Sequence, residues 1–142
     1  MKPLALSIIV LTGVGLVGCS KPATRTEFIR KDVACLRCYC ASNAIVAEKA
    51  LLELDQYARQ CQKEGVSGIL YDEVFSRIYG RLYLVEKQLG ERRAAEHCLQ
   101  KAVQHYQSSG HVPSQTGPPL PQIQELVIRA ANPGFNLAWQ NR

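Results

Sequence analysis

Residues 41–62, ASNAIVAEKALLELDQYARQCQ, decide the fold class, because they have the pattern of one long amphipathic helix. The segment contains no glycine or proline, and its small and apolar residues recur at spacings of three and four. Ser42 or Asn43 is suited to cap the first turn, and Gly65 is suited to the left-handed conformation that often follows a helix. We therefore predict a first helix over these residues. Its apolar stripe consists of Ala47, Ala50, Leu51, Leu54, Ala58 and Cys61.

Two further helices are expected downstream, over residues 69–89 and 91–107. Each has apolar residues at helical spacing on one face, and Gly90 separates the two segments. Gly80 lies inside the first of them, where glycine costs about 1 kcal/mol relative to alanine, so we expect a neighbouring helix to approach closely there. Connections this short make successive helices antiparallel. Residues 41–107 are therefore predicted to form an all-α domain, an antiparallel three-helix bundle.

The second and third of these helices resemble a tetratricopeptide repeat. Residues 79–83, YGRLY, are similar to its first-helix signature, and Gly90, Ala95, Leu99 and Ala102 are similar to its second-helix signature. The resemblance implies a helical hairpin that binds another protein, with the helix from residue 41 as a flanking cap. The two halves are offset by three residues from the repeat pattern, the terminal proline is missing, and a solenoid needs roughly three units. A plain three-helix bundle therefore remains the alternative.

The N-terminal residues 1–18 have the layout of a secretory signal peptide. Lys2 supplies a positive start, and residues 4–16, LALSIIVLTGVGL, form an uncharged apolar run with small residues near its end. This run is too short for a membrane-spanning helix, which needs roughly 20 apolar residues. The alternative is an N-terminal strand or helix of the core, although the run shows neither a period of two nor a polar face.

Directly after this run, Leu16-Val17-Gly18-Cys19 resembles the lipobox of bacterial lipoproteins. The resemblance implies that the Cys19 thiol receives a diacylglycerol through a thioether, that the chain is cut after Gly18, and that a fatty acyl group is added. Two or three acyl chains hold a protein stably at a membrane, whereas one does so only marginally. We therefore predict a lipid-anchored protein of the bacterial cell envelope, on the outer membrane facing the periplasm if the cell is Gram-negative. The alternative is an ordinary cleavage site with an incidental cysteine.

Residues 19–40 are predicted to be a basic tether behind the anchor. Removal of Lys2 with the signal peptide lowers the formal net charge by one, from +5 to +4. Anionic headgroups would attract the tether at up to about 1 kcal/mol per basic residue, and a solvated tether is the alternative. Nucleic acid is not expected as a partner, because the chain is exported and the modest basic excess has no aromatic interleaving. The basic residues are Lys21, Arg25, Arg30, Lys31 and Arg37.

The five other cysteines form the most distinctive chemical group. Cys35, Cys38 and Cys40 lie within six residues, and Cys61 and Cys98 follow. Structural disulfides among Cys35, Cys38, Cys40 and Cys98 are the first interpretation, because an envelope compartment is oxidising. Five thiols cannot all pair, so at least one stays free or bonds another molecule. Cys61, on the apolar stripe, is expected to behave as a small buried hydrophobe.

Two other interpretations of the cluster remain open. Cys35, Cys38 and Cys40 could bind a metal ion, since Cys-x-x-Cys is zinc-knuckle spacing, but a second knuckle or a histidine pair is missing. The same motif at a helix start could form a redox pair, because the helix N-terminus and the nearby Arg37 lower a thiol pKa. Strands and helices are not expected to alternate around the motif, so a thioredoxin-like fold has no support.

The C-terminal part differs in composition. Residues 108–121 are rich in proline, glycine and serine and are predicted to be a linker. Within residues 122–142 we expect a short helix up to about residue 131, followed by a tail, FNLAWQNR. The tail places apolar side chains at alternate positions and is expected to cover the bundle's own core or to bind a partner. These side chains are Phe135, Leu137 and Trp139.

The sequence indicates where the protein is located more clearly than which molecular activity it has. It lacks a phosphate-binding glycine loop, a Gly-x-Ser-x-Gly elbow and a His-Glu-x-x-His helix, so we do not expect an enzyme. The leading hypothesis is a non-enzymatic envelope lipoprotein whose helices bind another envelope protein. No cofactor is expected beyond the covalent diacylglycerol and fatty acyl groups at Cys19. The alternative is a thiol-redox or metal-binding lipoprotein that uses Cys35, Cys38 and Cys40.

Overall fold

The computed structural model describes residues 21–41, 43–110 and 120–132, and this part of the chain is all-α. No strand occurs in these ranges, so the predicted fold class is confirmed. The predicted signal peptide, Cys19 and the C-terminal tail lie outside the described residues. The five helices are α1 (Arg25–Ala41), α2 (Ala44–Lys63), α3 (Tyr71–Leu89), α4 (Arg92–Ser108) and α5 (Leu120–Ala131).

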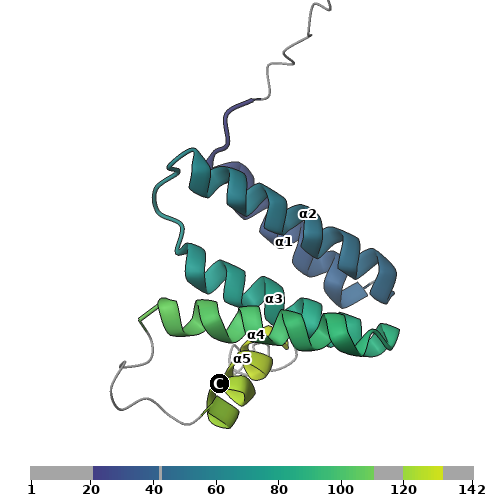
Figure 1. Cartoon of the computed structure of the whole chain (residues 1–142). Coiled ribbons are helices and arrows are strands. Elements are labelled where there is room, and N and C mark those ends of the chain that lie inside the picture. Colours follow the sequence, from purple (N-terminus) through teal and green to yellow (C-terminus); the bar gives the residue numbers. More distant parts are fainter. Residues whose placement is uncertain (1–20, 42, 111–119, 133–142) are drawn as a thin grey trace, which may run out of the picture.

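The helices form two antiparallel hairpins that stack through α2 and α3. In Figure 1, α1 and α2 lie side by side above α3 and α4, and α5 lies beneath the second hairpin. The helix α3 is central, because α2, α4 and α5 all pack against it. Its side chains are accordingly buried over most of its circumference, from Val74 to Glu86. None of the described helices is both long and apolar enough to cross a membrane.

The ends of the predicted helices lie where the sequence signals place them. Asn43 caps α2, and its side-chain oxygen accepts a hydrogen bond of 3.0 Å from the backbone amide of Val46. Gly65, at φ 70°, follows α2, and Gly90, at φ 82°, ends α3 in the left-handed conformation. The amide of Val66 then donates back to the carbonyl of Cys61 at 3.0 Å, which closes the end of α2.

Residues 25–41 differ from the predicted tether, because they form a helix that packs on α2. Its buried residues are Phe28 and Cys35, which are two turns apart and lie on the same face. The stripe is narrow, and charged residues surround it, so the segment resembles a solvated tether by composition. The described domain therefore has one helix more than the predicted three-helix bundle before α5 is counted.

The close helix contact predicted at Gly80 is present, but it is made with α5. A Cβ atom placed on Gly80 would lie 2.9 Å from the Cβ of Ala131 and 3.3 Å from the carbonyl oxygen of Val127. The tetratricopeptide resemblance implies close packing within the α3–α4 hairpin instead. This resemblance stays a prediction. The helix α5 begins at Leu120, inside the predicted linker, and its residues Ile123, Val127 and Ala131 are buried. The C-terminal helix thus belongs to the core.

Candidate functional site

The cysteine cluster lies on the C-terminal half of α1. Because a helix turns by about 100° per residue, Cys35 and Cys38 lie about 60° apart, whereas Cys40 lies about 140° from Cys35. The Cys35 side chain is buried and only 4% exposed, Cys38 is half-buried, and Cys40 is exposed. A helix therefore brings two of the three thiols together and directs the third elsewhere.

Cys35 and Cys38 share a groove between α1 and α2. The groove has a volume of about 200 Å³ and is open to solvent. Its other lining residues are Lys31, Ala34, Ala50, Glu53 and Leu54. A groove of this size admits a small molecule rather than a large ligand.

Burial raises the pKa of the Cys35 thiol to about 11, and the neighbouring guanidinium of Arg81 only partly opposes this effect. The redox interpretation placed the motif at a helix start, where a thiol pKa is lowered, and this expectation is wrong for Cys35. The motif lies near the end of α1, where the exposed carbonyl groups disfavour a negative charge. Cys35 is accordingly a poor nucleophile at neutral pH.

Arg81 on α3 is the least expected feature of this site. Its side chain is 3% exposed, and its Nε and Nη1 atoms have no hydrogen-bond partner within the described part of the chain. The guanidinium lies over the ring of Tyr39, 5.6 Å from the centroid. Beside it, Arg77 Nη2 donates to Asp32 Oδ2 at 2.9 Å. Burial and the nearby charge of Arg77 both lower the pKa of Arg81.

The disulfide and metal interpretations receive no support from the described residues. Cys35, Cys38, Cys40, Cys61 and Cys98 are all free thiols. The three clustered cysteines lie on α1, which packs on α2, whereas Cys98 lies on α4, which packs on α3 and α5. No group of three or more histidine, cysteine, aspartate or glutamate side chains within these ranges could hold a metal ion. The third candidate ligand of the cluster points away because α1 is a helix.

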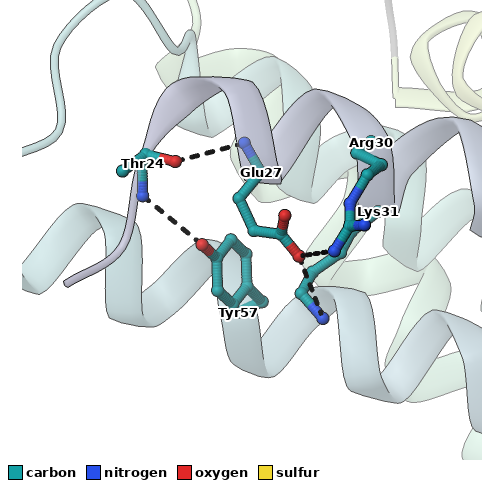
Figure 2. Close-up of polar contacts among 5 residues, drawn as sticks. All are labelled: Thr24, Glu27, Arg30, Lys31 and Tyr57. Carbon is teal, nitrogen blue, oxygen red and sulfur yellow. Dashed lines mark hydrogen bonds and ion pairs between the residues drawn. The ribbon is translucent and has the colours of Figure 1, made fainter. Parts of the chain in front are cut away.

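The start of α1 is fastened to α2 by polar contacts (Figure 2). The amide of Ala23 donates to Glu64 Oε2 at 2.6 Å, and the amide of Thr24 donates to the Tyr57 hydroxyl at 3.4 Å. The Thr24 hydroxyl oxygen accepts from the amide of Glu27 at 3.2 Å and so caps the helix. The chain is therefore fixed to the bundle from residue 23 onward.

Two of the five basic residues predicted for the tether are already paired with Glu27. Arg30 Nη2 lies 2.8 Å and Lys31 Nζ lies 3.8 Å from the same oxygen of Glu27, as Figure 2 shows. The hydrogen bond from Arg30 is the main reason that the pKa of Glu27 is lowered. Less positive charge is thus free for a membrane surface than the sequence suggested. The remaining basic residues of the segment are Lys21, Arg25 and Arg37.

The outer side of α1 carries exposed apolar side chains. Ile29 and Val33 are 49% and 45% exposed and lie one turn apart. On α2, Leu52 and Ile45 are more than half exposed as well. Among the described residues, most of the exposed large apolar side chains belong to this first hairpin rather than to α3 and α4. Ile29 and Val33, as neighbours on α1, are the candidate contact surface.

Comparisons with protein-family models, curated proteins and solved structures give no match to this chain. The lipobox and tetratricopeptide resemblances therefore remain predictions from the residues that carry them. No sequence pattern indicated that Asp32, Tyr39, Arg77 or Arg81 belongs to a site. One available signal was the position of Arg81 between Gly80 and Leu82, inside α3, which buries more residues than any other described helix.

Proposed function

We propose that this protein is a bacterial envelope lipoprotein, anchored through acyl groups on Cys19, whose helical domain binds another envelope protein. The observation that carries the proposal is the stretch Leu16-Val17-Gly18-Cys19 directly after a signal-like apolar run. In a Gram-negative cell, Ser20 favours the outer membrane, with the domain facing the periplasm. The proposed role is non-enzymatic.

The short distance from Cys19 to the bundle supports a domain held at the membrane surface. The amide of Ala23 already donates a hydrogen bond to Glu64 at the end of α2, and only three residues separate Ala23 from Cys19. An extended chain spans at most about 3.5 Å per residue, so the anchored residue lies within about 14 Å of Ala23. The α1–α2 hairpin would then be the part of the bundle nearest the lipid. Its exposed Ile29 and Val33 are the proposed contact for the partner protein.

Metabolic labelling with a radioactive fatty acid tests the anchor. We expect the label in the wild-type protein and in Cys40→Ser, which removes an exposed thiol from α1, but not in Cys19→Ser. Cys19→Ser should also accumulate with residues 1–18 attached. Equal labelling of Cys19→Ser and the wild type would refute the anchor.

A photo-crosslinking amino acid at position 33 tests the partner contact. It replaces the exposed side chain of Val33, and a matched probe replaces Gln104, which is exposed on α4. We expect one discrete adduct with another envelope protein from position 33, in intact cells, and none from position 104. Identical adduct patterns from both positions, or none from either, would contradict the proposed surface.

A further inference from the structure

Cys35 and Cys38 have the separation that a disulfide across one helical turn requires after a small movement. In a helix, Cβ atoms three residues apart lie about 5–6 Å from each other, whereas a disulfide brings them to about 3.5–4.5 Å. The backbone must therefore shift by roughly 1–2 Å for the bond to form. Cys40 shares no face with either residue, so Cys35–Cys38 is the one pairing within the cluster that the helix allows.

The position of Cys38 makes this movement possible. Cys38 lies in the last turn of α1, which ends at Ala41. The final four carbonyl groups of a helix have no partner within it, so its last turn is held by fewer hydrogen bonds than its interior. Cys35 is fixed by burial against the core, while Cys38 is half-exposed at the groove. The bond can thus form by movement of the helix end toward a stationary Cys35.

We propose that Cys35 and Cys38 form a reversible dithiol–disulfide pair that is oxidised by low-molecular-weight disulfides. The thiolate of Cys38 attacks one sulfur of the small disulfide, which gives a mixed disulfide on Cys38 and releases one small thiolate. The thiolate of Cys35, formed by loss of its proton to water, then attacks the Cys38 sulfur. The second small thiolate leaves, and the protein disulfide remains. Two protein thiols are oxidised, and one small disulfide is reduced to two thiols.

The environments of the two cysteines assign their roles. Cys38 is half-exposed at the groove and reacts first, whereas Cys35 lines the same groove but is only 4% exposed and reacts second. Arg81 is the cation whose charge favours the thiolate of Cys35 against the effect of burial. Because burial still keeps the pKa of Cys35 high, the second step is slow, which suits a switch rather than a turnover enzyme.

Oxidation is expected to act on the contact between α1 and α3. Tyr39 follows Cys38 directly, and its ring covers the guanidinium of Arg81. Drawing Cys38 toward Cys35 shifts this ring, so the buried arginine becomes accessible to solvent. The disulfide would thereby loosen the end of α1 from α3. This role is separate from membrane anchoring and needs no acyl group.

Oxidised glutathione and peptide mapping test the proposal on the purified full chain. Trypsin cuts after Lys31, Arg37 and Lys49, so Cys35 is in peptide 32–37 and Cys38 is in peptide 38–49. We expect oxidised glutathione to link these two peptides in the folded protein, and dithiothreitol to release them. Because peptide 38–49 also contains Cys40, the linked pair should persist in Cys40→Ser, which rules out a bond from Cys35 to Cys40.

The variant Cys35→Ser separates the two steps. We expect glutathione to remain on Cys38 at least about tenfold longer than in the wild type, because the resolving thiol is missing. Circular dichroism verifies that this variant is folded, and the wild-type mapping stands without it. A wild-type protein that keeps glutathione on Cys38, bonds Cys38 to Cys40, or links Cys35 only in urea would overturn the proposal.

Discussion

Replacement of Gly80 by alanine tests how tightly α5 is held against α3. In an exposed helix interior this change stabilises by about 1 kcal/mol. Here the new Cβ would lie 2.9 Å from the Cβ of Ala131, well inside the 3.5–4.0 Å of a favourable carbon contact. The carbonyl oxygen of Val127, at 3.3 Å, belongs to the backbone and cannot rotate away.

The magnitude follows from these opposing effects. Overpacking of a core costs about 1–3 kcal/mol, so the free energy of unfolding should fall by about 0–2 kcal/mol once the gain of about 1 kcal/mol in helix propensity is subtracted. Complete detachment of α5 would expose Ile123 and Val127, at about 1.5–3 kcal/mol each, so a shift of α5 by roughly 1 Å is the cheaper response. The melting temperature should fall by about 4–8 °C for each kcal/mol lost.

Urea unfolding followed by far-UV circular dichroism measures this loss. The control is Ala131→Gly, alone and combined with Gly80→Ala, because it removes the nearest atom. We expect the double mutant to recover part of the loss, with a coupling energy of about 1 kcal/mol. A Gly80→Ala protein that is more stable than the wild type, with no coupling to Ala131, would refute the close contact between α3 and α5.

Three further predictions concern buried polar groups. Arg81→Met should raise the free energy of unfolding by about 1 kcal/mol or more, as measured by urea titration. Each unpartnered buried donor of Arg81 costs about 1–3 kcal/mol, whereas the lost cation–π contact is worth about 0.5–2 kcal/mol. A less stable variant would indicate that Arg81 has a partner that was missed. Burial and the carboxylate of Glu48 raise the pKa of Glu86. The stability that protonated Glu86 contributes is therefore present below about pH 4.5 and is lost as the pH rises. Glu86→Gln should melt at a higher temperature than the wild type at pH 7, and the difference in melting temperature should close toward pH 4. At pH 8, iodoacetamide should modify Cys35 about a hundredfold more slowly in the folded protein than in urea, because burial raises the pKa of this thiol from 9.0 to about 11 and lowers its thiolate fraction by that factor. Equal rates by mass spectrometry would contradict the burial of Cys35.

The helices that sequence periodicity predicted are those with broad apolar stripes. The helices α2 and α3 bury residues at several successive turns, and α4 buries Ala95, Ala102 and Val103, so their pattern stands out over charged neighbours. The helix α1 buries Phe28 and Cys35, while the same face carries the polar Asp32 between them, so its pattern is too sparse to detect. A helix can be fixed by few buried residues of its own when the neighbouring helices supply the rest of the core.

The features of the candidate site depend on contacts between distant residues. The meeting of Gly80 with Ala131 joins positions about fifty residues apart, and local periodicity carries no record of such a contact. The burial of Arg81 was not predicted, because arginine is almost never fully buried without a partner. The faces on which the three cysteines lie follow from their spacing only once α1 is known to be a helix. The spacing then places Cys40 on a different face from Cys35 and Cys38.

The most direct test of the central claim is the intact mass of the protein purified from membranes in detergent. A lipid-anchored protein has lost residues 1–18 and begins with Cys19, which carries a diacylglycerol group and an additional fatty acyl group. We predict this mass, with the acyl groups assigned to Cys19 by fragmentation. An intact initiator methionine, or an unmodified Cys19 thiol at the new N-terminus, would contradict the assignment.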